Sequence, residues 1–394
     1  MTEGPRKSVR VEAEEAARRA EAREEARRAA RLARAAAVRA RRATHAARLT
    51  REVLHAGEGV SARLPAARSD AAALERRGLP VMHDAADLAT LLGMDMRALR
   101  WLTYHRDVAT VTHYRQFQVP KAKGGVRTIS APRPALRAAQ QAIRQHVLAR
   151  LEPTVHAQAF VRGRSTLTNA RPHLRAAVLV KADIRDFFGA IDFPRVRGLF
   201  EALGYSGMVA TLLGLLTTEA RRVEADLDGQ PAWVAVGPRA LPQGAPTSPE
   251  LTNQIARRLD ARLAGYARRH GWVYTRYADD LAFSSQDGAR ERVGRLLGVV
   301  RAALEGEGFQ LNPDKLVVVR RGRQQRVTGV VTNDVAGLPR ATLRRFRAAV
   351  HRVTRAGFAD PAERARMLGY ASYVKMVKPA LGERWLRALR EVPA

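Results

Sequence analysis

The feature that most constrains the fold is a pair of adjacent carboxylates, Asp279 and Asp280, set between two β-rich segments. Residues 272–277 and 281–284 are rich in β-branched and aromatic side chains, which favours an antiparallel hairpin with the acids at its turn. Neighbouring carboxylates repel each other, and a divalent cation between them removes that cost. An Asp-Asp pair alone is most often a solvated turn, so a metal site has to be supported by the rest of the chain.

A further candidate carboxylate follows an apolar run earlier in the chain. Residues 177–184 predict a buried strand that delivers Asp183 to its carboxyl end. A strand ending in one acid and a hairpin carrying two would hold two Mg²⁺ ions, which prefer oxygen ligands and are used in nucleotide addition. We therefore expect Asp183 and Asp279 to bridge the ions, with Asp280 as the third carboxylate.

The charge of the chain favours a nucleic-acid partner. The formal net charge is +31, and residues 1–60 account for only +6 of it. A basic body of this kind favours a groove lined by phosphates. The chain has no cysteine, which excludes disulfides, thiolate zinc sites and a cysteine nucleophile and fits the cytoplasm. No secretory signal and no transmembrane helix are expected, so we expect no membrane partner.

The first 75 residues differ from the rest in composition. Residues 8–55 lack Gly and Pro and are rich in Ala, Arg and Glu, which predicts a long helix with acids in its first half and bases in its second. Large apolar residues are few, so no continuous coiled-coil seam is expected. A solvated helix or low-complexity arm is favoured over a dedicated RNA-binding helix. Residues 56–70 are expected to form a linker.

The rest of the chain predicts an α+β body. Its C-terminal part should begin with a helix that places Leu343, Phe346 and Val350 on one face, with arginines around it. Residues 219–240 are expected only to link two helices. The other expected elements are helices at 84–92, 95–104, 134–151, 194–203, 207–218, 249–269, 289–306 and within 340–391, a basic hairpin over 114–129, and two strands around 320–326.

Three motifs in this order resemble the palm of reverse transcriptases. The stretch that begins at Asp183 is similar to the family's first carboxylate motif, Leu241–Pro246 to its Leu-Pro-Gln-Gly motif, and Tyr277–Asp280 to its Tyr-x-Asp-Asp motif. Each motif alone is weak, but the three together are specific, and the resemblance covers residues 79–390. It implies a right-hand polymerase with fingers at 76–175, a palm with an antiparallel sheet at 176–335, and a helical, RNA-binding thumb at 336–394. The N-terminal helical extension and linker at 1–75 are not covered by the resemblance.

The resemblance also implies roles around the incoming dNTP. Phe188 would lie under the sugar and exclude a 2′-hydroxyl, although core packing is the alternative. Gln243 and Asp186 would lie beside the nucleotide. Lys121 and Arg127, on the basic hairpin, would bind phosphates, with solvated hairpin charges as the alternative.

Two further implications concern the chemistry. Lys315 would protonate the leaving pyrophosphate, unless Asp314 beside it makes it only a member of an ion pair. Mn²⁺ could replace Mg²⁺. The metal-binding positions implied are Asp183, Ile184, Asp279 and Asp280.

Two short motifs narrow the resemblance to retron reverse transcriptases, namely the Asn-Ala-x-x-His signature at 169–173 and the Val-Thr-Gly signature at 327–329. Such enzymes copy their own structured non-coding RNA. They start from the 2′-hydroxyl of an internal guanosine and leave a branched RNA–DNA hybrid (msDNA). An effector protein in anti-phage defence is a further implied partner. The RNA-binding positions implied are Asn169, His173, Val327, Thr328, Gly329, Arg344, Arg345, Arg347 and Arg352.

Three alternatives stay open at this point. The chain could be another bacterial reverse transcriptase of the group II intron, diversity-generating or abortive-infection type. It could be an RNA-binding scaffold that does not use its palm, which the intact carboxylates disfavour. It could also be an RNA-dependent RNA polymerase, which Phe188 disfavours.

Overall fold

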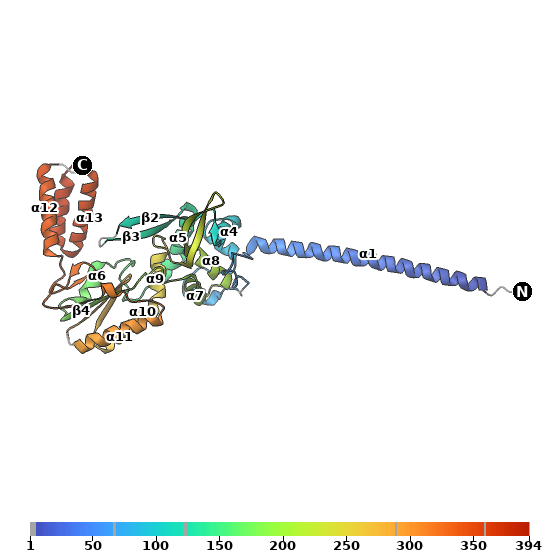
Figure 1. Ribbon diagram of the computed structural model, residues 1–394, viewed down its shortest axis with the longest axis horizontal. Helices are drawn as coiled ribbons and strands as arrows, with labels where there is room; N and C mark the ends of the chain where they lie inside the picture. The colour runs from blue at the N-terminus through green and yellow to red at the C-terminus, as the bar shows by residue number, and fades with distance from the viewer. Residues whose placement is uncertain (1–4, 66–67, 121–123, 288–289, 358–359, 394) are drawn as a thin grey trace.

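The protein consists of a mixed α+β body from which one long helix projects (Figure 1). The computed structural model describes residues 5–65, 68–120, 124–287, 290–357 and 360–393. The projecting helix, α1 (Pro5–Arg51), is continuous, which confirms the helix predicted from its Ala, Arg and Glu content. Within the described part of the chain, no helix is long and apolar enough to cross a membrane.

The segment after α1 is packed against the body, and the prediction of a linker over 56–70 is wrong in this respect. Val53, Ala56, Val60 and Leu64 are buried in the main hydrophobic core. Gly57 adopts a φ of +112°, and a Cβ there would lie 2.2 Å from the carbonyl oxygen of His105. The glycines therefore serve close packing rather than freedom of movement, a distinction that composition does not reveal.

Three short helices follow, each started by an aspartate. These are α2 (Ala71–Arg76), α3 (Ala85–Leu91) and α4 (Met96–Thr103). The carboxylates of Asp70, Asp84 and Asp95 accept a hydrogen bond from a main-chain amide in the first turn, as expected for N-cap residues. The helices predicted at 84–92 and 95–104 are thus confirmed.

The sheet that carries the carboxylates has four antiparallel strands in the order β7-β8-β4-β9. Alternate side chains of the central strand β4 enter different cores. Val178 and Val180 join the main core, whereas Leu179 joins the C-terminal core. The strands are β7 (Val273–Tyr277), β8 (Asp280–Ser285), β4 (Val178–Asp183) and β9 (Val317–Arg320).

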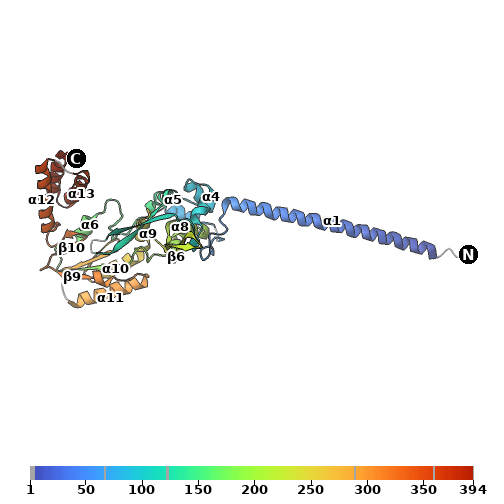
Figure 2. The ribbon, with the colours of Figure 1, turned by 45° about the horizontal axis from the view of Figure 1, so that its top comes forward.

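Helices α10 (Arg257–Arg269) and α11 (Arg290–Gly306) cover the main-core face of this sheet (Figures 1 and 2). Sequence predicts one helix over 249–269, but the structure has two, α9 (Ser248–Ile255) and α10, which meet at Ala256. The remaining helices of the body are α5 (Pro134–His146), α7 (Phe193–Leu203) and α8 (Gly207–Thr217), all at predicted places. Every residue of α8 is buried.

The basic hairpin is formed by β2 (Tyr114–Pro120) and β3 (Val126–Pro132), as predicted. The segment 219–240, expected only to link two helices, is instead a hairpin of β5 (Glu219–Leu227) and β6 (Gln230–Ala240), with β1 (Val108–Ala109) at its edge. Asp228 and Gly229 form its turn, both with positive φ. The Asp-Gly pair is the sequence signal that could have revealed it.

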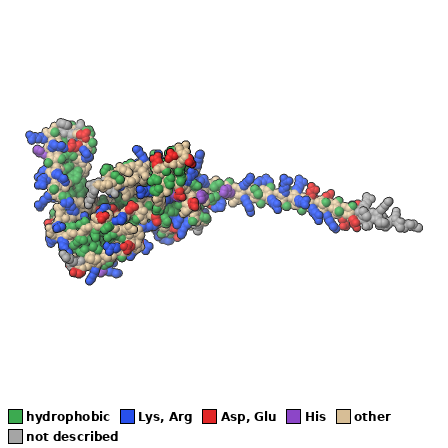
Figure 3. Space-filling model, viewed as in Figure 1, with side chains coloured by type: hydrophobic (Ala, Val, Ile, Leu, Met, Phe, Trp, Pro, Cys, Tyr) green, Lys and Arg blue, Asp and Glu red, His purple; other side chains and the backbone are tan. Residues whose placement is uncertain are grey.

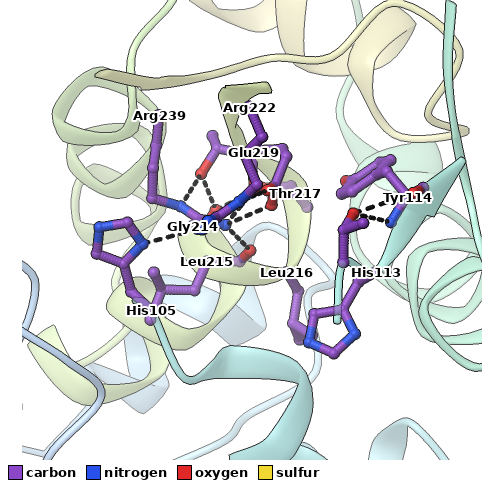
Figure 4. Close-up of polar contacts among 12 residues, drawn as sticks. His105, His113, Tyr114, Gly214, Leu215, Leu216, Thr217, Glu219, Arg222 and Arg239 are labelled. Atoms are coloured by element: carbon purple, nitrogen blue, oxygen red, sulfur yellow. Dashed lines mark hydrogen bonds and ion pairs between the residues drawn. The ribbon is translucent and has the colours of Figure 1, made fainter. Parts of the chain in front are cut away.

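A buried charge cluster joins this hairpin to the end of α8 (Figure 4). The Arg222 guanidinium donates to Glu219 over 2.9 Å and to the carbonyl oxygen of Trp233 over 3.0 Å. Arg239 donates to the carbonyl oxygen of Leu215 over 2.9 Å, and burial lowers the pKa of its guanidinium. Arg239 thus satisfies carbonyl groups at the end of α8, where intrahelical donors run out, while Arg222 satisfies carbonyl groups of β6 and of the segment before β1, so the cluster is structural.

The C-terminal part folds into three helices with their own core. Phe346 packs edge-on against Trp385, with ring centroids 5.1 Å apart. Leu343, Phe346 and Val350 all face this core, which confirms the predicted apolar face. The elements are β10 (Arg326–Val327), β11 (Val330–Val331), α12 (Arg340–Ala356), α13 (Pro361–Val377) and α14 (Pro379–Glu391), with the short α6 (Thr166–Ala170) against them.

Candidate active site

Three carboxylates lie together at one end of the β4–β8 strand pair. Asp183 ends β4 and stands opposite Asp280, the first residue of β8. Asp279 occupies the turn after Ala278, whose φ is +55°. The main-chain amide of Ile184 donates to the carbonyl oxygen of Asp279 over 3.0 Å. Strand register and this tie therefore fix the positions from which the three acids project.

The acids repel one another where water is partly excluded, since Asp183 is buried, Asp279 is half-buried and Asp280 is exposed. Burial, followed by the charges of Asp280 and Asp183, together raises the pKa of Asp279 to about 6. Burial and then the charge of Asp183 raise the pKa of Asp280. Bringing acids together out of water costs free energy, and such an arrangement is typical of a site that binds a cation.

Two neighbouring side chains engage both oxygens of Asp183. The Lys315 ammonium lies 2.7 Å from Oδ2, and this hydrogen bond is the main cause of the raised pKa of Lys315. The amide of Asn312 donates to Oδ1 over 3.0 Å, and its main-chain N–H donates to the Asp183 carbonyl oxygen over 2.8 Å. The ion-pair alternative for Lys315 thus has Asp183, not Asp314, as its partner. Asn312 has no counterpart in the sequence predictions.

The donor set suits a divalent cation such as Mg²⁺, because it consists of carboxylate oxygens whose mutual repulsion a cation would relieve. In the arrangement described here, no three side chains of His, Asp or Glu among the described residues converge closely enough to enclose an ion. Lys315 holds one oxygen of Asp183 instead. A cation that bound Oδ2 of Asp183 would have to displace Lys315.

A buried ion pair contacts the main chain of the turn that carries Asp279 and Asp280. Arg276 on β7 is fully buried and makes two parallel hydrogen bonds of 2.8 Å to Asp260 on α10. Its guanidinium also donates to Asn253 on α9 over 3.1 Å and to the carbonyl oxygen of Ala278 over 3.3 Å. Tyr274 donates to Asp260 over 2.9 Å. One guanidinium thus ties the turn to two helices. Sequence reasoning missed it, because a charged residue in a strand is ordinarily placed in solvent.

The residues expected around a nucleotide lie at the same end of the sheet. Phe188 is half-buried, with its ring 6.4 Å from that of Phe160, while Phe187 is buried against Phe309. Asp186 is exposed and has a φ of +43°. Phe187 therefore does the core packing, which leaves part of the Phe188 ring accessible.

The Leu-Pro-Gln-Gly segment contacts the basic hairpin. The carbonyl oxygen of Gln243 accepts a hydrogen bond of 2.7 Å from the amide of Ser130. Gly244 has a φ of +119°, and a Cβ there would lie 2.8 Å from Ile129. Arg127 is exposed on the same hairpin. Lys121 lies outside the described residues.

The two short motifs predicted to bind RNA lie largely inside the protein. His173 is buried and forms hydrogen bonds with Ser284 over 2.7 Å and Thr275 over 2.8 Å. Asn169 is buried and donates to Thr328 over 3.3 Å. Direct contact of RNA with these two side chains, or with the buried Val327, conflicts with this burial. Of the predicted RNA-binding positions in the two motifs, only Thr328, in part, and Gly329 are accessible, although Arg171 and Pro172 between Asn169 and His173 are exposed as well.

The arginines predicted on the first C-terminal helix are exposed. Arg352 forms an ion pair with Glu363. The exposed set on α12 is Arg344, Arg345, Arg347 and Arg352.

Comparison with known proteins identifies related sequences over most of the chain. The family model described as reverse transcriptase (RNA-dependent DNA polymerase) matches residues 119–371. The retron Mx65 reverse transcriptase of Myxococcus xanthus is 46% identical over 319 residues, which cover 81% of this chain and 74% of that protein. The retron Mx162 reverse transcriptase of the same organism is 43% identical over 330 residues, covering 80% and 68%.

More distant similarity extends to another bacterium and to telomerase. The retron Ec86 reverse transcriptase of Escherichia coli is 31% identical over 308 residues, covering 77% of this chain and 88% of that protein. A structure of telomerase from Candida albicans in complex with a fragment of telomeric RNA aligns with a TM-score of 0.42 at 11% identity, covering 71% of this chain and 55% of that one.

Proposed function

This chain belongs to the retron reverse transcriptases, which are RNA-directed DNA polymerases, and from that premise we propose that it copies its own structured non-coding RNA into DNA. Synthesis would start from the 2′-hydroxyl of an internal guanosine and give a branched RNA–DNA product (msDNA). The observation that carries the proposal is the set of three carboxylates at the end of β4 and the start of β8, where the pKa values of Asp279 and Asp280 are raised. A defence role with an effector protein belongs to the same proposal.

The proposed division of the body follows a right-hand polymerase, with fingers at 76–175, a palm at 176–335 and a thumb at 336–394. The four-stranded sheet with the carboxylates would be the floor of the palm. The three C-terminal helices, which have a core of their own, would be the thumb. Residues 52–75 belong with the body rather than with the projecting helix, because their apolar side chains fill its core.

Asp183, Asp279 and Asp280, with Ile184 beside them, would hold two Mg²⁺ ions, for which Mn²⁺ could substitute. When bound, such ions lower the pKa of the attacking hydroxyl and neutralise charge on the reacting phosphates. Lys315 would move from Asp183 toward the leaving pyrophosphate and donate its proton there. Asn312 would keep Asp183 in place through its two hydrogen bonds when Lys315 leaves.

The dNTP would lie between the palm and the basic hairpin. Phe188 would support the sugar and leave no room for a 2′-hydroxyl. Gln243 and Asp186 would contact the nucleotide from the palm, and Lys121 and Arg127 would bind its phosphates from the hairpin. The link between Gln243 and Ser130 supports this arrangement, since it joins both walls of the proposed pocket.

The RNA would contact the exposed arginines of α12, together with Thr328 and Gly329. Because A-form RNA is recognised mainly through phosphates and 2′-hydroxyls, arginines are suited to this part. Asn169, His173 and Val327 would act indirectly, by fixing the strands and turn that carry the accessible residues.

Substitution of the paired acids tests the proposed chemistry. Asp279→Asn and Asp280→Asn should each lower DNA synthesis by at least about 100-fold, because charge stabilisation at the reacting phosphate is lost. RNA binding should stay close to wild type, since the basic surface is unchanged. Primer extension and RNA binding would be measured on the same preparations. Full DNA yield from the doubly substituted protein would contradict the assignment of these residues.

The priming mode needs a separate test. Nucleic acid that co-purifies with the protein should contain DNA joined to an internal guanosine of one RNA through a 2′,5′ linkage. A debranching enzyme should separate the two strands. DNA that carries no RNA branch would leave a reverse transcriptase with a different way of starting synthesis.

A further inference from the structure

The second half of α1 carries a one-sided positive charge. Between residues 26 and 51 there are nine arginines and no Asp or Glu. At 3.6 residues per turn, eight of the nine fall within about half of the helix circumference, and the opposite half consists of Ala and Thr apart from Leu32 and Arg51. All of them are exposed (Figure 3). These eight residues, called the arginine face below, are Arg27, Arg28, Arg31, Arg34, Arg39, Arg41, Arg42 and Arg48.

Most of this charge has no acidic partner. Arg48 pairs with Glu52 at 2.7 Å. The seven arginines from 27 to 42 have no carboxylate partner among the residues that the structure describes. Like charges three and four residues apart destabilise a helix, so the arginine face costs free energy when nothing neutralises it. The sequence alone favoured a merely solvated helix, but this segregation indicates a charged ligand.

The arginine face has a fixed direction because α1 is held at its end. Arg51, on the other side of the helix, lies 2.6 Å from Asp84 and 3.1 Å from Asp87 at the start of α3. Arg100 of α4 donates to the carbonyl oxygens of Leu49 and Glu52. The face from residue 27 to residue 48 is about 30 Å long. It is a preformed straight surface that projects from the body (Figures 1 and 3).

We propose that the arginine face of α1 binds a double-stranded segment of the RNA that the enzyme copies. This rests on the proposed function, which supplies a structured RNA. The phosphates of an A-form helix offer a regular row of negative charge, and arginine binds phosphate through two donors at once. The contact would hold a stem away from the active site while the template strand is copied.

Two other occupants fit less well. A membrane surface requires several large apolar residues opposite the bases, but Val38 and Leu49 lie on the arginine side, and Leu32 alone lies outside it, next to its edge. A second helix could approach the alanine side, where Ala29, Ala33, Ala36 and Ala40 follow steps of four and three. That contact would leave the arginine charge unbalanced, so it is treated as an outcome of the test.

The test compares two full-length variants that lose the same charge. The first removes four arginines of the face, and the second removes four exposed arginines of α10 and α11 on the body. Both are examined by circular dichroism to verify that helix content is retained. The face variant is Arg27→Gln, Arg31→Gln, Arg34→Gln and Arg41→Gln, and the matched control is Arg268→Gln, Arg269→Gln, Arg295→Gln and Arg301→Gln.

Binding of an RNA hairpin with a fully paired stem of about 20 base pairs is followed by fluorescence anisotropy over a range of salt concentrations. The face variant should bind at least about tenfold more weakly at 0.1 M salt, and the slope of log K against log salt should fall by about 3. The affinity of the control variant for the RNA should fall by less than about threefold, because its arginines contribute only to the overall positive potential of the protein.

Three results would overturn the proposal: unchanged affinity of the face variant, an equal loss in both variants, or an effect seen only when Ala29, Ala33, Ala36 and Ala40 are replaced by Gln. The last result, with a change of molecular mass in light scattering, would mean that the helix binds protein. Primer extension on a short primer–template is measured in parallel. Wild-type extension by the face variant shows that the polymerase is intact, so failure of the RNA contact is distinguishable from failure of the proposed function.

Discussion

Two antiparallel hairpins of this molecule differ in nearly every contact they make. The β7–β8 hairpin is buried along most of its length, and its buried charged and polar side chains have specific partners. The β2–β3 hairpin is exposed along most of its length, and within the described residues it touches the palm chiefly through Ser130 and Ile129. Both are equally visible in the sequence as β-rich segments around a turn.

The difference follows from the kind of side chain that each hairpin would carry in the proposed function. Reacting groups have to be held within fractions of an ångström, and only a packed, fully bonded scaffold provides that precision. Groups that bind a mobile ligand such as a nucleotide triphosphate work from an exposed surface. We therefore expect substitutions in β7–β8 to act on stability and those in β2–β3 to act on substrate binding.

The largest expected effect comes from breaking the ion pair below the Asp279–Asp280 turn. Arg276→Gln leaves Asp260 buried without its guanidinium, which should lower the free energy of unfolding by about 3–5 kcal/mol. Urea unfolding measures the change. Arg276→Gln combined with Asp260→Asn should recover part of the loss, because no uncompensated charge remains. A loss below about 1 kcal/mol for the single variant would contradict the role given to Arg276.

The next effect depends on pH and concerns His173, which joins β7 to β8. Burial lowers the pKa of His173 from 6.5 to about 4, so the folded protein keeps this ring neutral. The stability that the neutral, buried His173 contributes is fully present above pH 6.5. It is lost as the pH falls from 6.5 toward 4, because His173 binds a proton in the unfolded chain before it does so in the folded protein. Between pH 7 and pH 5 the free energy of unfolding should fall by about 2 kcal/mol through this group.

Comparison with His173→Gln isolates this contribution from other titrating groups. Glutamine can still bond to Thr275 and Ser284 but does not titrate. The difference in unfolding free energy between the two proteins should therefore narrow as the pH falls to 5. A difference that stays constant over this range would show that His173 is not the titrating group.

A smaller effect is expected where the exposed hairpin meets the palm. Gly244→Ala introduces a Cβ at a φ of +119° and within 2.9 Å of the Ser130 carbonyl oxygen. It should cost about 1–3 kcal/mol of stability and displace the hairpin from Gln243. Thermal unfolding and the KM for dNTP measure both effects. Gly237→Ala, in open space and without positive φ, is the control and should change neither.

The smallest effect on stability should come from the tip of the exposed hairpin. Arg127→Ala should change the unfolding free energy by less than about 0.5 kcal/mol, since the side chain is solvated. It should raise the KM for dNTP by about tenfold, as expected for loss of a charged contact to phosphate. Thr128→Ala, on the opposite face of the same strand, should leave KM unchanged. Equal KM values for both variants would remove Arg127 from the proposed pocket.

The same contrast explains how far the sequence could predict the structure. The strand that ends in Asp183, the Asp-capped helices and both of these hairpins carry local signals, and the structure confirms these elements. The β5–β6 hairpin, in a segment expected only to link two helices, was not predicted, and its charged residues Arg222 and Glu219 neutralise each other inside the protein. The packing of residues 53–64 was missed because Gly57 suggested flexibility, although the neighbouring backbone requires it there.

The partners of the predicted site residues could not be predicted at all. Asn312 and Lys315 are about 130 positions from Asp183, and nothing local indicates that they share its carboxylate. Arg276 carries no sign of burial in its own segment, since its counter-charge lies on α10. Motifs thus identified the candidate reacting residues. The residues that keep those side chains in position are brought near them only by tertiary contacts, which the motifs do not reveal.

The length of α1 has a consequence for how the protein behaves in solution. Its 47 residues extend over about 70 Å, which is more than three times the radius of gyration of about 20 Å expected for a compact body of this size. A rod of this length increases friction far more than it increases mass. The 43.4 kDa monomer should therefore elute from a gel-filtration column ahead of globular standards of equal mass. Its subunit number is better determined by light scattering than by elution volume.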